Sequence, residues 1–488
     1  MARLVIRNCS VLVVPPAGEC RVDEYQDIVI EDGVIDEVMP SGAFTGEAGV
    51  EEVDASGLIA VPGLVNSHTH SPMVMMRGAA EDVSIDDWFN RRIWPMETNL
   101  TPERVKAGAR LACAEMLLAG VTTFVDHYFH ADQIAAAALE LGIRADLAPT
   151  FFSSAGADGR EAAYDAARAI RALGAAADEY PRITASLGPH APYTVTDEDL
   201  TRTAEVARAE GFRIHLHAAE TEDQTRSSQE RFGATPIEIL ERTGVLRAGV
   251  LIAHGCSLTD SDLSILTAQA ERSRRSDQPG GLFDQPGPFD QPGPFNQSDQ
   301  SNPFDQAGRT TVAACLKVYL KLAMGSTTPV KQLQQAGVPV GVGTDGAAVH
   351  NTLDVWESLR LLALTQKQRE QDAEWMTVSD TLRLATRGGA AAAGRPDSIG
   401  AIEPGRRADI ALVDLSGPHC QPLHDPRAAL VYSTRASDVV TVVVDGNIVV
   451  RDRRLLTADL DEILAEARAV AHTLVDLSRG GAVQHYAP

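Results

Sequence analysis

The middle of the sequence alternates helix-like and strand-like segments, and this rhythm is the strongest constraint on the fold. Five amphipathic segments each end in glycine, a common helix C-terminus, and a short apolar run follows at once. The five pairs are RVKAGARLACAEMLLAG with VTTFVDH, QIAAAALELG with IRADLAPT, DLTRTAEVARAEG with FRIHLHAAE, PIEILERTG with VLIAHG, and PVKQLQQAG with VPVGVGTDG. Such alternation predicts an α/β fold with a parallel sheet, most economically closed into a (β/α)8 TIM-like barrel. An open doubly wound sheet is the rival, but no glycine-rich phosphate turn follows the first strand.

Both ends of the chain are instead rich in short strands. The first 60 residues include DIVIEDGVIDEV, and a later stretch, DVVTVVVDGNIVVRD, contains the hairpin signal Asp445-Gly446. We therefore expect a small composite β-sandwich built from residues 1–60 and 397–455. The barrel is expected to span residues 61–396, and residues 456–488 to form a C-terminal helix and tail.

One segment interrupts the barrel rhythm. Residues 271–308 repeat an Asp-Gln-Pro-Gly-Pro-Phe unit and are rich in proline and glycine. A composition of this kind does not supply enough apolar surface for a core. We interpret the segment as a low-complexity surface insertion; an interaction tail for a partner is the alternative.

Charge and cysteine usage narrow the class of protein. The formal net charge of −24 and the pI of about 4.9 argue against a nucleic-acid partner, which would require a basic stripe. The six cysteines are scattered without close pairs, as is typical of reduced thiols in a cytoplasmic protein. No apolar run of 18 residues and no leader-like N-terminus is present, so no membrane association is expected.

Polar residues with metal-binding or acid/base chemistry follow the apolar runs of the central region. They are His68 and His70 after LIAVPGLVNS, His190 after ITASLGP, His217 and Glu220 in RIHLHAAE, His254 in VLIAHG, and Asp345 in VPVGVGTDG. In a parallel barrel all of these strand ends meet at one mouth. A single histidine there is more often structural, but five with a carboxylate favour a metal site.

The spacing within the set indicates how one ion is held. Alternate residues of a strand share a face, so His68 and His70 both point into the barrel mouth. His217 adds a third nitrogen and Asp345 an oxygen, a donor set that suits one divalent ion, Zn²⁺ first and Fe²⁺ second. A second ion would need a bridging lysine or acid, and ITASLGPHAPYT offers none.

Three residues are candidates for the catalytic steps. Glu220, in a strand-to-helix turn, is the predicted general acid/base, although an acid at a helix N-terminus is its alternative interpretation. His254 is expected to hydrogen-bond the attacking oxygen or to polarise the substrate. Asp345 is expected to accept the proton of the water while it binds the metal.

The motifs PGLVNSHTH, HAAET, AHG and GTDGA, in this order, resemble the amidohydrolase superfamily, in its deaminase and chlorohydrolase branch. The resemblance covers nearly the whole chain, including IEPGRRADIALVD. It implies that His68, His70, His217 and Asp345 bind the metal, Glu220 shuttles the proton and His254 is the catalytic histidine. The assignment from strand ends agrees with this.

Within that branch, DDWFNRRIWPMETNLT, GPHAPYT and GADGREAAY look most like enzymes that deaminate S-adenosylhomocysteine, 5′-methylthioadenosine or adenosine. The resemblance implies that Trp88 and Glu97 contact the ribose side and that His190 and Arg160 complete the nucleoside pocket. Without the resemblance, Trp88 is more often a packing aromatic residue and Arg160 a surface charge.

The sequence departs from the family pattern at two places. Ala314 occupies the position of a histidine on the predicted seventh strand, and Val318-Tyr319 replace a Ser-Asn pair; Val349-His350 replace another such pair after Asp345. These changes leave the predicted metal ligands intact but alter the wall of the pocket beside the base.

We therefore predict a metal-dependent deaminase that releases ammonia from an adenosine-like nucleoside or a related N-heterocycle. One alternative is a chlorohydrolase or other cyclic amidine hydrolase that acts on a triazine or pterin. The other is a non-catalytic binding relative, given the altered seventh strand. The resemblance also implies a homo-oligomer.

Overall fold

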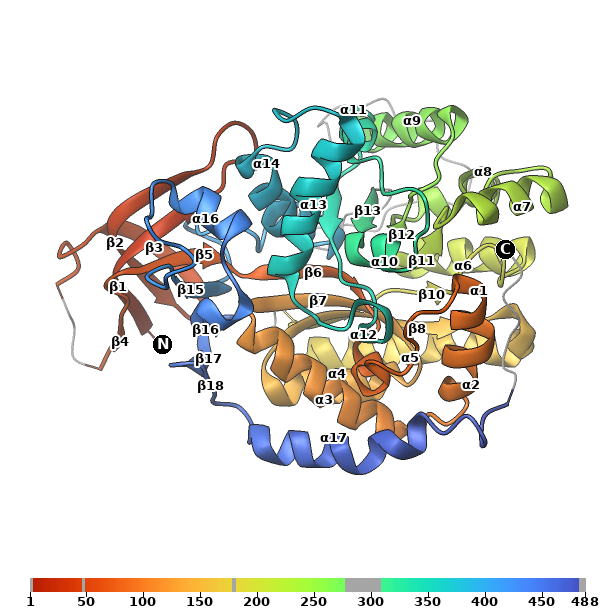
Figure 1. Cartoon of the computed structure of the whole chain (residues 1–488), viewed down its shortest axis with the longest axis horizontal. Helices are drawn as coiled ribbons and strands as arrows, with labels where there is room; N and C mark the ends of the chain where they lie inside the picture. Colours follow the sequence, from red (N-terminus) through yellow and green to blue (C-terminus); the bar gives the residue numbers. More distant parts are fainter. Residues whose placement is uncertain (1–2, 46–48, 178–180, 277–308, 482–488) are drawn as a thin grey trace, which may run out of the picture.

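The central region forms the predicted (β/α)8 barrel in the computed structural model, which describes residues 3–45, 49–177, 181–276 and 309–481 (Figure 1). Its strands form two parallel sheets, with neighbouring strands in the orders β10-β8-β7-β6, with β9 beside β8, and β11-β12-β13-β14. The strands are β6 Leu64–Thr69, β7 Val121–Tyr128, β8 Arg144–Phe151, β9 Ile183–Ala185, β10 Gly188–Pro189, β11 Ile214–Ala218, β12 Val250–His254, β13 Thr310–Ala314 and β14 Val340–Val342.

Two sets of backbone hydrogen bonds join these sheets into a ring. On one side, the Leu187 amide donates to the Arg213 carbonyl (2.8 Å), and the His215 amide donates to the Leu187 carbonyl (2.9 Å). On the other side, the Asp345 amide donates to the His68 carbonyl (3.0 Å), which links the end of β14 to β6. The second seam therefore brings a predicted metal-binding carboxylate next to a predicted metal-binding histidine.

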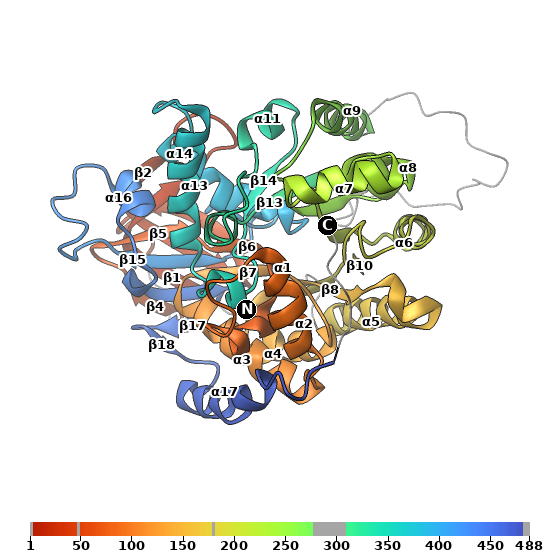
Figure 2. The ribbon, with the colours of Figure 1, turned by 45° about the vertical axis from the view of Figure 1, so that its right-hand side comes forward.

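Helices cover the outside of the barrel (Figure 2). The order of the elements along the chain confirms the five predicted helix–strand pairs as α3-β7, α4-β8, α6-β11, α8-β12 and α11-β14. Gly142 and Gly211 end α4 and α6 with φ of 81° and 69°, a conformation that L side chains rarely adopt. The helices are α1 Ile85–Asp87, α2 Trp94–Glu97, α3 Pro102–Leu118, α4 Ala131–Leu141, α5 Gly156–Ala177, α6 Asp197–Glu210, α7 Glu222–Phe232, α8 Pro236–Arg242, α9 Asp260–Ser276, α10 Leu316–Lys321, α11 Val330–Gln335, α12 Ala347–His350, α13 Val355–Glu370, α14 Val378–Arg383, α15 Gly389–Ala392, α16 Pro426–Tyr432 and α17 Leu460–Leu474.

Strands from both ends of the chain lie side by side, at the left in Figure 1. Where a β-sandwich was predicted, the described residues form one hydrogen-bonded sheet of nine strands. The Asp445-Gly446 turn, with both residues at positive φ, forms the predicted hairpin between β16 and β17. Alternate apolar residues from both chain ends pack into one cluster. The strands are β1 Arg3–Val13, β2 Arg21–Glu31, β3 Val34–Pro40, β4 Glu51–Asp54, β5 Leu58–Pro62, β15 Ile410–Asp414, β16 Val439–Val444, β17 Asn447–Arg451 and β18 Arg454–Leu455.

The predicted domain boundaries can be compared with these elements. β5 ends at Pro62, β18 ends at Leu455, and α17 lies within the C-terminal region 456–488. Residues 271–276 of the proposed insertion instead continue α9, which ends at Ser276, directly before the repeat begins. The rest of the insertion, 277–308, lies outside the described residues.

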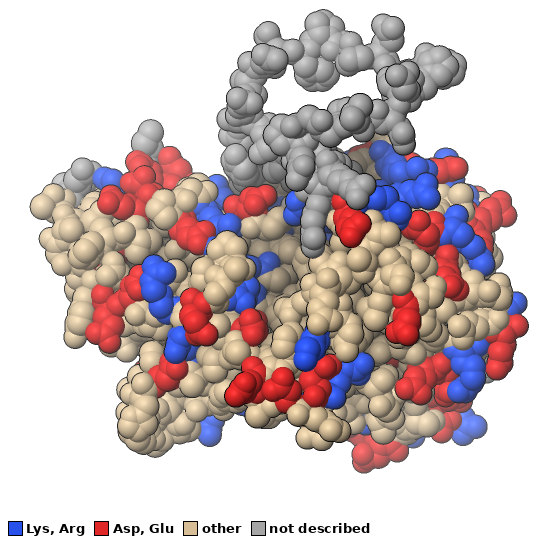
Figure 3. Space-filling model, turned by 90° about the horizontal axis from the view of Figure 1, so that it is seen from above, with Lys and Arg blue, Asp and Glu red and all other residues tan. Residues whose placement is uncertain are grey.

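The charge of the surface and the apolar character of the helices indicate which partners the protein could bind. Acidic and basic side chains are interspersed over the face shown in Figure 3, so the described part of this face carries no continuous basic stripe. Among the described helices, none combines the length and apolar character needed to cross a membrane.

A buried charge cluster connects the barrel to the nine-stranded sheet. Arg144, at the start of β8 and fully buried, donates two hydrogen bonds of 3.0 Å to Asp409 and one of 3.0 Å to Asp445. Arg144→Met would leave both carboxylates without this guanidinium in a buried setting. We expect it to lower the free energy of unfolding by roughly 3–5 kcal/mol, measured by equilibrium urea denaturation.

The matched control is Arg226→Met, which removes an exposed pair with Asp223 on α7. Solvent screens that pair, so we expect a change of less than about 1 kcal/mol. Equal effects of the two substitutions would show that the buried cluster does not stabilise the junction.

Candidate metal centre and active site

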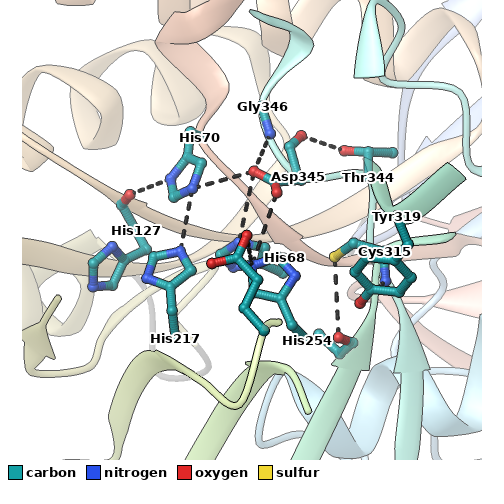
Figure 4. Close-up of polar contacts among 12 residues, drawn as sticks. His68, His70, His127, His217, His254, Cys315, Tyr319, Thr344, Asp345 and Gly346 are labelled. Atoms are coloured by element: carbon teal, nitrogen blue, oxygen red, sulfur yellow. Dashed lines mark hydrogen bonds and ion pairs between the residues drawn. The ribbon is translucent and has the colours of Figure 1, made fainter. Parts of the chain in front are cut away.

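The four predicted metal ligands converge at the carboxyl end of the barrel strands (Figure 4). His68 lies in β6, His70 directly follows it, His217 lies in β11 and Asp345 follows β14. The Nε2 atoms of His70 and His217 are 3.3 Å apart, and Asp345 Oδ1 lies 3.3 Å from His70 Nε2 and 3.9 Å from His68 Nε2. The donor atoms of His68, His70 and His217 lie within 4.8 Å of one another, as do those of His68, His254 and Asp345, so His68 belongs to two overlapping groups that could hold an ion.

The other ring nitrogens of these histidines are held by neighbouring groups. His70 Nδ1 donates to the His127 carbonyl (2.6 Å), and His217 Nδ1 donates to the His190 carbonyl (2.9 Å). Each Nε2 is therefore left with a lone pair, and the two lone pairs face one another at 3.3 Å. Two facing acceptors repel unless a cation lies between them, so the arrangement fits a bound metal ion.

His68 supports the same conclusion. Its Nδ1 lies 2.8 Å from His215 Nε2, and its own Nε2 is buried without a hydrogen-bond partner. Burial lowers the pKa of His70 to about 4 and lowers the pKa of His68 and His217 well below the usual value. All three imidazoles are therefore neutral at pH 7, the protonation state that binds metals.

Glu220 and His254 lie beside the ligands. Glu220 precedes Thr221, the N-cap of α7, so it is not one of the first-turn acids of that helix. His254 Nε2 lies 3.7 Å from Glu220 Oε1 and 3.9 Å from Asp345 Oδ2. The three predicted catalytic side chains thus surround one point next to the ligand nitrogens.

The protonation of Glu220 suits a residue that takes up and releases a proton. Burial raises the pKa of Glu220 to about 7, while Gln224 Nε2 donates to its Oε2 (3.0 Å) and holds the carboxyl group in place. A carboxyl group with a pKa near the working pH is populated in both forms, which is what general acid/base catalysis needs.

The backbone at this mouth is locally strained. Ala219, His254 and Asp345 have φ of 52°, 78° and 61°, in the left-handed region that non-glycine residues seldom occupy. Such residues cost on the order of 1–3 kcal/mol each and tend to cluster at functional sites. His254 ends β12, and Ala219 and Asp345 follow β11 and β14, so all three lie at the strand ends that carry the candidate ligands.

A cavity opens onto this cluster of candidate ligands and catalytic side chains. Trp88, Glu97 and His190, the predicted substrate contacts, all line it. The remaining lining residues are His70, Met73, Phe89, Ile93, Trp94, His127, Tyr128, Phe129, Thr150, Phe152, Tyr193, His217, Glu220, His254, Val318, Leu322, Asp345 and Val349.

Arg160 is not brought to this cavity. It lies on α5 and forms ion pairs with Asp199 and with Glu161, the latter at 3.2 Å. Two carboxylates within reach of the guanidinium hold it outside the lining. The position of Arg160 therefore fits a surface charge better than a substrate contact.

Two residues that depart from the family pattern give the cavity an apolar wall. Val318 lies on α10, after the seventh strand, and Val349 lies on α12, after the eighth, and both line the cavity. Tyr319 points elsewhere: its hydroxyl accepts from the Cys315 amide (2.8 Å) and from Thr328 Oγ1 (3.2 Å), and its ring lies 5.8 Å from that of His254. Tyr319 therefore packs beside His254 and does not line the cavity.

His127 is a cavity residue that the sequence interpretation missed. It lies near the end of β7, its Nδ1 is 2.8 Å from Thr150 Oγ1, and its Nε2 is buried without a hydrogen-bond partner. The sequence did contain a signal for His127, because VTTFVDHY places a histidine at the end of a strand, as the other motifs do. Tyr128 and Thr150 line the cavity beside it.

Glu97 makes the stability of the protein depend on pH. Its enclosed position raises its pKa to about 7 from the usual 4.5, so the folded state keeps a proton that the unfolded state has released. Stability should therefore fall as the pH rises from about 4.5 to about 7. Glu97→Gln cannot ionise, so its stability relative to wild type should increase by about 3 kcal/mol between pH 4.5 and pH 8, measured by urea denaturation. A difference that stays constant over this range would contradict the raised pKa.

A (β/α)8 barrel with three neutral imidazoles, a carboxylate and a buried acid at its mouth defines a metal-dependent hydrolase. The Amidohydrolase family profile matches residues 59–449. The chain belongs to this family. It is 36% identical over 478 residues to the 5-methylthioadenosine/S-adenosylhomocysteine deaminase of Pelotomaculum thermopropionicum, a match that covers 98% of this chain and 100% of that protein.

Solved structures of similar fold agree. A zinc-bound adenosine deaminase from Xanthomonas campestris matches with a TM-score of 0.83 and 30% identity, over 97% of this chain and 98% of that chain. The atrazine chlorohydrolase of Arthrobacter aurescens TC1, complexed with zinc, matches with a TM-score of 0.79 and 25% identity, over 96% and 100% of the two chains.

Proposed function

We propose that this protein is a metal-dependent hydrolytic deaminase of an adenosine-type nucleoside. The observation that carries the proposal is the convergence of Glu220, His254 and Asp345 on one point beside the three histidine donors. The deaminase names of similar proteins support the substrate class.

The residues His68, His70, His217 and Asp345 would hold one divalent ion, with zinc first because two similar structures contain it. When bound, such an ion polarises water and lowers its pKa towards neutrality. Asp345 would also accept a proton from the attacking water, since its carboxylate faces both His70 and His254.

Glu220 would carry protons through the reaction. As water oxygen bonds to the amidine carbon of the base, the ring C=N double bond becomes single, and Glu220 delivers a proton to that ring nitrogen. When the exocyclic C–N bond then breaks, the amino group takes the proton that Asp345 accepted from the water and leaves as ammonia. The C–OH group becomes C=O, and its proton returns to Glu220. His254, 3.7 Å from Glu220, would hydrogen-bond the attacking oxygen.

In the cavity, Glu97 would accept hydrogen bonds from ribose hydroxyls, and Trp88 and His190 would pack against the nucleoside. We further propose a cytoplasmic homo-oligomer. The six cysteines are all buried and unpaired, which fits a reducing compartment.

The test is ammonia release by zinc-loaded protein from adenosine, 5′-methylthioadenosine, pterins and triazines. Ammonia from a nucleoside supports the proposal. Chloride release from a chlorotriazine without nucleoside turnover would favour the alternative, a chlorohydrolase, which the similarity to atrazine chlorohydrolase keeps open. Metal binding with no turnover of any substrate would indicate a binding protein.

A further inference from the structure

The cavity beyond the metal ligands contains an acid but no base strong enough to be cationic at neutral pH. Among the described residues that line it there is no lysine and no arginine, while Glu97 supplies a carboxyl group. The remaining wall is mainly aromatic and aliphatic. These apolar lining residues are Met73, Trp88, Phe89, Ile93, Trp94, Phe129, Phe152, Val318, Leu322 and Val349.

The basic residues of two neighbouring helices, α10 and α5, that lie nearest the cavity in sequence form ion pairs with carboxylates outside it. Val318 of α10 and Leu322, the C-cap residue of that helix, line the cavity. Lys317 of the same helix pairs with Glu357 (2.8 Å), and Lys321 pairs with Glu81 (2.6 Å). Arg160 on α5 is held by Asp199 and Glu161, as described above. The segment 277–308, which precedes the altered strand, contains no lysine or arginine in its sequence.

An anion that entered this cavity would lose its hydration without gaining a cationic partner. Burying an unpaired carboxylate or phosphate among apolar side chains is strongly unfavourable, and Glu97 would add like-charge repulsion whenever it is ionised. A neutral group has no such cost. A thioether or alkyl substituent would pack against the aromatic wall, and hydroxyl groups could donate to Glu97.

We propose that the cavity selects adenosine-type nucleosides whose 5′ substituent is uncharged and excludes those that carry a carboxylate or phosphate there. This inference rests on the proposed deaminase function. It predicts that this protein accepts 5′-methylthioadenosine but not S-adenosylhomocysteine, although the name of the Pelotomaculum thermopropionicum relative contains both compounds.

The experiment compares nucleosides that differ in charge at matched size. For wild type we expect kcat/KM for S-adenosylhomocysteine and adenosine 5′-monophosphate to be at least about 100-fold below that for 5′-methylthioadenosine. The deciding pair is 5′-S-(2-carboxyethyl)-5′-thioadenosine and its carboxamide, which differ by one charge and hardly in shape. The carboxamide should be the better substrate by at least about 10-fold.

Variants on one helix test the same idea from the protein side. Leu322→Arg places a cation at the partly buried rim of the cavity, and we expect it to raise the ratio of carboxylate to carboxamide kcat/KM at least about 10-fold. Leu320→Arg is the control, because Leu320 is 50% exposed on the same helix and does not line the cavity. It should leave the ratio unchanged.

The outcomes separate the inference from the function it rests on. Equal kcat/KM for the carboxylate and its carboxamide would overturn the inference while deamination stands. If no nucleoside releases ammonia, the proposed function fails. Calorimetric titration of zinc-loaded protein with the same pair then still decides whether the cavity rejects the charge.

Discussion

Glu220→Gln is expected to lower kcat by roughly 10²–10⁴-fold while the protein retains its metal. Gln has nearly the shape of Glu, so the hydrogen bond from Gln224 and the position beside His254 can be kept in a related form. What the amide cannot do is take a proton from water and pass it to a ring nitrogen. The measurement is steady-state ammonia release together with metal analysis of the purified variant.

The control for this substitution lies two residues along the chain. Glu222→Gln makes the same chemical change at an exposed first-turn position of α7, outside the cavity lining. We expect its kcat to match wild type. If Glu220→Gln instead lost the metal, Glu220 would have to be assigned to the metal site, and the acid/base role would need another residue.

The barrel and the convergence of the candidate metal ligands could be predicted because both follow from local periodicities. Glycine-terminated helices next to apolar runs predicted the alternation of α3-β7 and its counterparts. Parallel strands share one carboxyl edge, so histidines at the ends of separate strands had to meet. His70 and His217, 147 positions apart in the chain, lie 3.3 Å apart through their Nε2 atoms for this reason.

Features that depend on side-chain partners could not be predicted in this way. Arg160 matched a motif, but its side chain forms an ion pair with Asp199 on α6, and no local sequence pattern predicts this contact. Tyr319 replaces a polar family residue, yet its hydroxyl is engaged by Cys315 and Thr328. The start of the insertion was misplaced because charged residues such as Glu271 and Arg272 suit both a helix end and a loop.

His70→Ala is expected to reduce bound metal to a small fraction of one ion per chain and to lower kcat/KM by at least about 10³-fold. The substitution removes the nitrogen that lies 3.3 Å from both His217 Nε2 and Asp345 Oδ1. Only three of the four proposed ligands then remain. Elemental analysis after dialysis gives the metal content. Added zinc should raise the melting temperature of wild type, because an ion that binds only the folded state stabilises it, but not that of the variant.

His424→Ala supplies the comparison, since His424 is exposed and does not line the cavity. It should keep its metal, its activity and its response to zinc. Full metal content in His70→Ala would mean that the two facing Nε2 atoms do not share an ion. Their 3.3 Å separation would then require one ring to carry its proton on Nε2, although the His127 and His190 carbonyls both accept from Nδ1. Metal content therefore discriminates between a cation and a proton as the group that relieves the repulsion of the two nitrogens.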